Sequence, residues 1–144
     1  MSFFENYVYM LRMVLDILLF TWPVTLAILI NQCLAAALDR PLRDPRLKRY
    51  KWVLLLTPFG LALCLVAVGI AWQVDPNPLD PPTPNWIGSS LLAMLHVFAV
   101  LTSIWVIARM RGNEWFGISF LLTLGLLVFA SGQIAVACLT GGWT

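Results

Sequence analysis

Charged residues are scarce in this chain, and their scarcity excludes most classes of soluble protein. Only 11% of the 144 residues are Asp, Glu, Lys or Arg, whereas about a quarter are charged in a soluble domain. Hydrophobic residues make up 60%, and the mean hydropathy is +0.85. The net charge of +2 is too small to indicate a nucleic-acid-binding surface, so we expect no nucleic-acid partner. This composition predicts a membrane protein, with a single domain over residues 1–144.

Residues that usually carry chemistry are also scarce. Three cysteines lie far apart in apolar runs and there is one histidine, so no Cys/His grouping for a metal or redox centre is present. The sequence has no Ser/His/Asp arrangement, glycine-rich phosphate loop or pair of catalytic carboxylates. We therefore predict no metal site, no catalytic residue and no enzymatic activity. The N-terminus lacks the basic region and cleavage site of a signal peptide, so we expect Met1 onward to be mature chain.

Four apolar runs are long enough to cross a bilayer core of roughly 30 Å. Their limits are about residues 13–38, 52–73, 86–108 and 115–139. Trp52 to Trp72, and Trp86 to Trp105, each cover about 28–30 Å of helix, which matches the preference of indoles for the two membrane interfaces. The sequence thus predicts an all-α, polytopic membrane protein with four transmembrane helices.

A basic connector fixes the expected orientation of these spans. Residues 39–51 hold six of the nine Lys and Arg residues, namely Arg40, Arg43, Arg46, Lys48, Arg49 and Lys51. Short basic loops stay cytoplasmic, so we place 39–51 there, together with residues 109–114, which carry Arg109 and Arg111. These cations are also expected to contact lipid head groups. The proline-rich segment 75–85 has no cation and is predicted to be periplasmic, like both termini. We expect two hairpins, N-out and C-out, in a bacterial cytoplasmic membrane.

Proline and small residues indicate how the spans bend and pack. Pro23 lies inside the first span and should leave the Leu19 carbonyl without its helical partner, while Thr57-Pro58 predicts a bend in the second span. Small residues at helical spacing predict faces of close helix contact. These faces are Gly60, Cys64, Ala67 and Ala71 in the second span, and Gly117, Gly125, Gly132 and Ala135 in the fourth.

His96 is the first candidate for a functional residue. It lies ten residues after Trp86, hence roughly 15 Å into the membrane and near its midplane. One interpretation makes it an axial ligand to haem or a chlorophyll-type pigment, or a proton relay. The interpretation we favour makes it a hydrogen-bond partner between helices, in a groove of small residues. One histidine cannot supply both axial ligands of a haem within one chain, so no cofactor is predicted.

Asp16 and Arg12 are the second candidate site. They lie one helical turn apart and can form an ion pair near the outer boundary. Alternatively, Asp16 is the proton-coupled carboxylate of a small exporter, by analogy of architecture alone. Gln73 and Gln133 should reach a similar depth, which predicts an outer polar cluster of these four side chains. The polar contacts expected between helices are those of Asn31, Gln32, Gln73, Ser103 and Gln133.

These features leave three functions open. The favoured one is a non-catalytic subunit of a larger bacterial inner-membrane complex, with other membrane subunits as partners, because the chain has little mass outside its spans and thinly spread polar groups. The second is a small proton-coupled transporter or ligand-binding homodimer that uses Asp16. The third is a haem- or pigment-binding membrane protein that uses His96.

Overall fold

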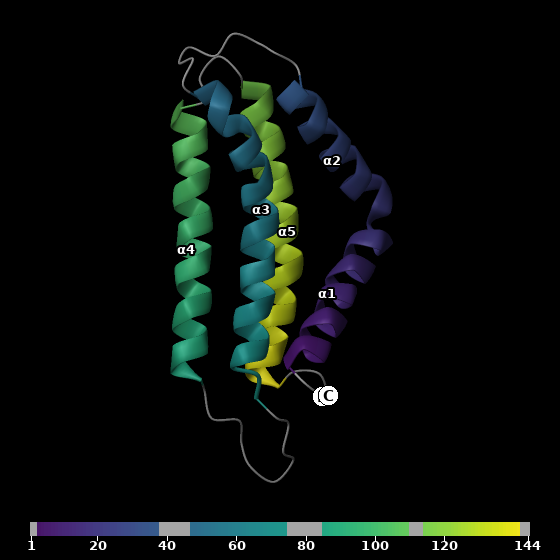
Figure 1. Cartoon of the computed structure of the whole chain (residues 1–144), viewed down its shortest axis with the longest axis vertical. Coiled ribbons are helices and arrows are strands. Elements are labelled where there is room, and N and C mark those ends of the chain that lie inside the picture. The colour runs from purple at the N-terminus through teal and green to yellow at the C-terminus, as the bar shows by residue number, and fades with distance from the viewer. Residues whose placement is uncertain (1–2, 38–46, 75–84, 110–113, 142–144) are drawn as a thin grey trace.

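The computed structural model describes residues 3–37, 47–74, 85–109 and 114–141, and these form five α-helices and no strand. The helices are α1 (Phe3–Phe20), α2 (Trp22–Ala37), α3 (Leu47–Ala71), α4 (Trp86–Arg109) and α5 (Glu114–Thr140). The three long helices α3, α4 and α5 lie along the long axis of the molecule, with α4 antiparallel to the other two (Figure 1). Helices α1 and α2 form a bent arm on one side (Figure 1). The prediction of an all-α protein is therefore confirmed.

The number of helices that can cross a membrane is three or four. Within α3, residues Val53–Ala71 are long and apolar enough to cross, and so are α4 and α5 over their whole lengths. The α1–α2 arm passes the same test only when both helices are counted as one bent span. The chain is thus a membrane protein by the length and composition of its helices.

The first predicted span differs from the structure, because it is not one helix over residues 13–38. A helix already begins at Phe3, and the chain bends by 94° at the break before α2 begins at Trp22. Pro23 lies in the first turn of α2, where a missing N–H and a fixed φ are tolerated, so it starts a helix here instead of bending one. The apolar span within α3, Val53–Ala71, agrees with the second predicted span of about 52–73, while the helix itself begins earlier and includes residues 47–51 of the basic connector.

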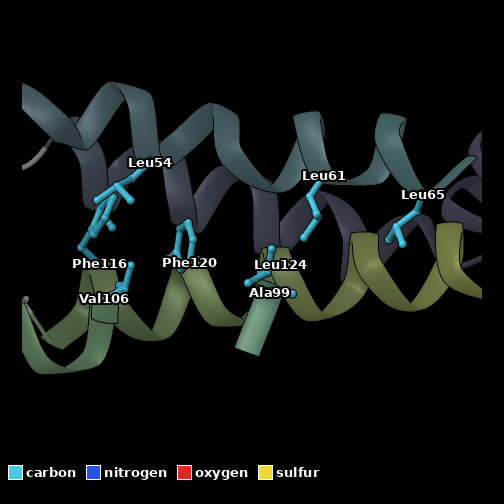
Figure 2. Close-up of a cluster of buried hydrophobic side chains, with 9 residues drawn as sticks. Leu54, Leu61, Leu65, Ala99, Val106, Phe116, Phe120 and Leu124 are labelled. Carbon is cyan, nitrogen blue, oxygen red and sulfur yellow. The ribbon is translucent and has the colours of Figure 1, made fainter. Parts of the chain in front are cut away.

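The backbones of α3 and α5 approach each other closely at Gly69. A Cβ built on Gly69 would lie 2.7 Å from the Cα of Ala135, so only glycine permits this approach. Figure 2 shows the leucines of α3 facing the aromatic and leucine side chains of α5, with α4 closing one side. The labelled residues are Leu54, Leu61, Leu65, Ala99, Val106, Phe116, Phe120 and Leu124.

The small-residue faces predicted from the sequence are only partly used within the chain. In α5, Gly117, Gly132 and Ala135 are buried. In α3 the predicted face points outward, because Gly60 and Cys64 are exposed. The face of α3 that packs toward α5 instead carries Leu54, Leu61 and Leu65, whose side chains interdigitate with those of α5.

Candidate functional site

The break between α1 and α2 is lined by threonine hydroxyls. The Thr21 hydroxyl lies 3.1 Å from the Ile17 carbonyl oxygen, a bond within one turn. The Thr25 hydroxyl donates across the break to the Leu18 carbonyl, at 3.1 Å, and its own oxygen lies 3.1 Å from that of Thr21. In hydrocarbon no water can satisfy carbonyls released at a bend, so these hydroxyls stabilise it. The sequence shows the signal, threonine on both sides of Pro23, but we did not predict this role.

Contacts with α3 and α5 hold α1 in place. Met10 and Val14 are buried against α3 and α5, in a cluster with Val66, Ile70, Ala130, Ile134 and Cys138. The Tyr7 hydroxyl donates to the Leu63 carbonyl at 3.3 Å. The Cys138 thiol lies 3.9 Å from the Met10 sulfur, as a weak hydrogen bond. These contacts define one face of α1 as inward and the opposite face as outward.

Arg12 and Asp16 lie on the outward face of α1. Both side chains are exposed, and the described residues contain no ion pair between them. Asp16 precedes the break by five residues, and Figure 1 shows the break about midway along the length of the bundle.

The predicted cluster of Arg12, Asp16, Gln73 and Gln133 is not joined by hydrogen bonds or ion pairs in the part of the chain that the structure describes. Gln73 is half-buried just after the end of α3. Gln133 is exposed on α5, seven residues before the end of that helix. The four side chains thus face different surroundings rather than one common pocket.

His96 lies between α4 and α5. Its Nδ1 is 2.8 Å from the Leu92 carbonyl oxygen, which can only accept, so Nδ1 carries a proton and donates it. A Cβ built on Gly132 would be 3.2 Å from His96 Nε2, which means that the imidazole edge packs directly on this glycine. Ser103, also a predicted polar contact, donates instead to the Ala99 carbonyl of its own helix at 2.8 Å.

Asn31 and Gln32 behave differently although they are neighbours. Asn31 donates through Nδ2 to the Ser119 hydroxyl at 2.7 Å, which in turn donates to the Trp115 carbonyl at 2.8 Å. Gln32 is only 1% exposed, and neither its amide nitrogen nor its amide oxygen has a partner. Asn31 therefore joins α2 to α5, whereas the Gln32 amide is buried without compensation.

Most of the basic side chains are not among those that the structure describes. Arg109 is exposed in the last turn of α4, where a cation is favoured by the helix dipole. Lys48, Arg49 and Lys51 belong to the first turns of α3, but their side chains are not among those described. Arg40, Arg43, Arg46 and Arg111 lie outside the described ranges.

The geometry brings together no set of reactive groups in the described ranges. No group of three or more His, Cys, Asp or Glu side chains there could hold a metal ion. No protein-family model, curated protein or solved structure matches this chain. Inferences about function therefore rest on the direction in which the polar side chains point.

Proposed function

We propose that this chain is a non-catalytic, integral-membrane subunit of a larger complex in a bacterial cytoplasmic membrane. In this proposal the α1–α2 arm is one bent span, and the chain crosses four times as two hairpins. Residues 39–51 and 109–114 are cytoplasmic, while 75–85 and both termini are periplasmic. The observation that supports the proposal most directly is an outward polar side chain on α5.

One stripe of α5 faces outward although the rest of the helix is largely buried. It comprises Ile118, Leu122, Gly125, Phe129 and Gln133. The side chain of Gln133 is exposed about 10 Å before the end of α5, hence inside the hydrocarbon, where an amide without a partner costs about 1–3 kcal/mol. Nothing lies within 4 Å of a Cβ built on Gly125, so a neighbouring helix has room to approach. A helix of another subunit that bonds to Gln133 would satisfy both features.

Co-purification tests this proposal. A tagged chain extracted from its native membrane in a mild detergent should carry other membrane proteins in fixed stoichiometry. Gly125→Leu and Gln133→Leu should abolish this recovery without destabilising the chain. Gly60→Leu is the matched control, because Gly60 on α3 also has nothing within 4 Å of its built Cβ. Recovery of a stable chain without any stoichiometric partner would contradict the proposal.

The proposed topology has a separate test. Single cysteines that replace Arg43 and Asp80, in a chain without its native cysteines, should react with a membrane-impermeant reagent from opposite sides. Labelling of both positions from the same side would overturn the four-span arrangement. The same experiment at the two termini should place both of them outside.

A second candidate function is a small proton-coupled transporter or ligand-binding homodimer that uses Asp16. The break in the α1–α2 arm favours it, because discontinuous helices build binding sites at mid-membrane depth in many transporters. In purified chain reconstituted into vesicles, proton flux should then fall strongly on Asp16→Asn. Equal flux in the two proteins would remove the basis for this candidate.

A third candidate function is haem or pigment binding at His96. The bond from Nδ1 to the Leu92 carbonyl supports it, since ligating histidines usually donate their second ring N–H in this way. Contact of the Nε2 edge with Gly132 leaves less room for a porphyrin on that side. Visible absorption of the full-length protein decides this candidate, and a colourless preparation from native membranes excludes it.

A further inference from the structure

The outward face of α1 has the residue spacing of a helix-pairing seam. Val8, Arg12, Leu15 and Leu19 recur at steps of four, three and four residues, which places them on one face of the helix. The apolar members are half or more exposed, at 50% for Val8, 57% for Leu15 and 65% for Leu19. Arg12 lies within this seam, and Asp16 lies one turn after it. No described part of the chain covers this face.

Of the two charges on α1, that of Asp16 lies at a depth where lipid does not satisfy it. The α1–α2 break is about midway along the bundle, and Asp16 precedes it by five residues, or about 8 Å of helix. Arg12 can extend its long side chain toward the nearer interface, but the short Asp16 side chain cannot. Since no ion pair joins them in the described chain, the Asp16 carboxylate needs a cationic partner from outside it.

The arrangement of these charges fits a second copy of the same chain. Two copies with the same membrane orientation are related by a twofold axis along the membrane normal, which places equivalent faces of α1 against each other. Arg12 and Asp16 are about 6 Å apart along the helix axis, so the arginine of one copy reaches the aspartate of the other, and the reverse. A face that carries one cation and one anion can therefore pair both charges with a second copy of itself. A lipid phosphate would pair only with the arginine.

We propose that this protein forms a homodimer through α1, in which Arg12 of each copy pairs with Asp16 of the other. Val8, Leu15 and Leu19 supply the apolar contacts around two charge-assisted pairs, each shielded from water. The stripe on α5 that is proposed to bind another subunit is a different surface. The homodimer therefore stands independently of that proposal.

Charge reversal tests the reciprocal pairs. Two differently tagged copies are expressed together in membranes, and each is tested for recovery with the other. R12D carries two acids and D16R carries two bases, so each variant should capture itself at least about tenfold less than wild type. R12D and D16R together should capture each other as well as wild type captures itself. If Arg12 and Asp16 instead paired within one copy, the two variants would not restore capture when combined, because each of them lacks that pair.

Two results would overturn the homodimer. One is a wild-type chain that does not capture its differently tagged copy. The other is wild-type self-capture combined with no capture between R12D and D16R. If either variant fails to insert, disulfide trapping keeps the wild-type charges: in a chain without native cysteines, Leu15→Cys should cross-link two copies in the membrane. Val14→Cys is its control, since Val14 is buried toward α3 and α5, and equal cross-linking at both positions would also overturn the proposal.

Discussion

Two regions of this molecule, the α3–α5 pair and the α1–α2 arm, place their polar groups in opposite ways. In the pair, the buried hydroxyls of Ser119, Thr123 and Ser131 donate to carbonyls four residues earlier in their own helix. Polar atoms are thereby satisfied locally, and helix contact depends on shape. In the arm, Arg12 and Asp16 face outward without such local partners.

This difference distinguishes the contacts that stabilise the chain from the side chains that remain available for contact with other proteins. Between helices in lipid, small residues that permit close contact contribute more than apolar burial, because lipid tails are as apolar as leucine. The α3–α5 pair follows this rule at Gly69. In the proposed homodimer, pairing between copies offsets the free energy that the outward charges of the arm cost in lipid. Substitutions at the close contact between α3 and α5 should therefore affect stability, and substitutions of the outward charges of α1 should affect association.

The largest effect on stability is expected at Gly69. Gly69→Ala places a Cβ 2.7 Å from the Cα of Ala135. Neither atom can move aside by a side-chain rotation, so the two helices must separate. We expect a loss of about 1–3 kcal/mol. Gly60→Ala in the same helix meets nothing within 4 Å and should be neutral, or up to about 1 kcal/mol more stable from helix propensity. Unfolding by SDS in mixed micelles compares the two, and equal losses would contradict the packing.

The next prediction concerns two adjacent residues of α2, whose substitutions should change the free energy of unfolding in opposite directions. Gln32→Leu replaces a buried amide without partners by an apolar side chain of similar size, so the isolated chain should gain about 1–2 kcal/mol. Asn31→Leu removes the 2.7 Å bond to Ser119 and should lose about 0.5–1 kcal/mol. The same SDS titration measures both. A destabilised Gln32→Leu would show that the amide has a partner in the native membrane protein.

Proline illustrates how far the sequence could predict this fold. Pro23 and Pro58 both lie in apolar runs, each with a nearby threonine. The sequence predicted a bend at Pro58, but at Pro23 only that the Leu19 carbonyl loses its helical partner. At Pro23 the chain breaks by 94°, whereas α3 continues through Pro58 as one helix. The difference is tertiary, because Pro58 is fully buried and Pro23 is exposed. Packing along α5 surrounds α3 at Pro58, whereas the described contacts at the break of the arm are the hydroxyl bonds of Thr21 and Thr25.

Candidate side chains were found by residue type, but their surroundings were not predictable. Rare polar residues in an apolar sequence identify themselves, so His96, Asp16 and Gln32 could all be selected. Which face of a helix is buried depends on its neighbours, and the small-residue face of α3 pointed outward for that reason. The contact of Gly69 with Ala135 has no sequence signal beyond glycine itself, and it was missed.

A smaller effect should distinguish hydroxyls at the break from hydroxyls in a regular helix. Thr25→Val removes the donor to the Leu18 carbonyl across the bend, and we expect a loss of about 1 kcal/mol. Thr102→Val is the control, because Thr102 donates to the Phe98 carbonyl four residues earlier in an unbroken helix. There the change should stay within about 0.5 kcal/mol. Equal losses would show that the break needs no hydroxyl.

The smallest effect concerns the contact between α4 and α5, and it is best measured as a coupling. Gly132→Ala places a Cβ 3.2 Å from His96 Nε2, so the ring must shift by a few tenths of an ångström while its Nδ1 remains bonded to Leu92. We expect a loss of about 0.5–1 kcal/mol in the wild-type chain. In a His96→Ala chain the same substitution meets no ring and should cost nothing, and a double-mutant cycle isolates the difference. An equal cost in both backgrounds would mean that the imidazole does not determine how closely α4 approaches α5. This contact would then resemble the outward surfaces of the arm more than the close packing of the α3–α5 pair.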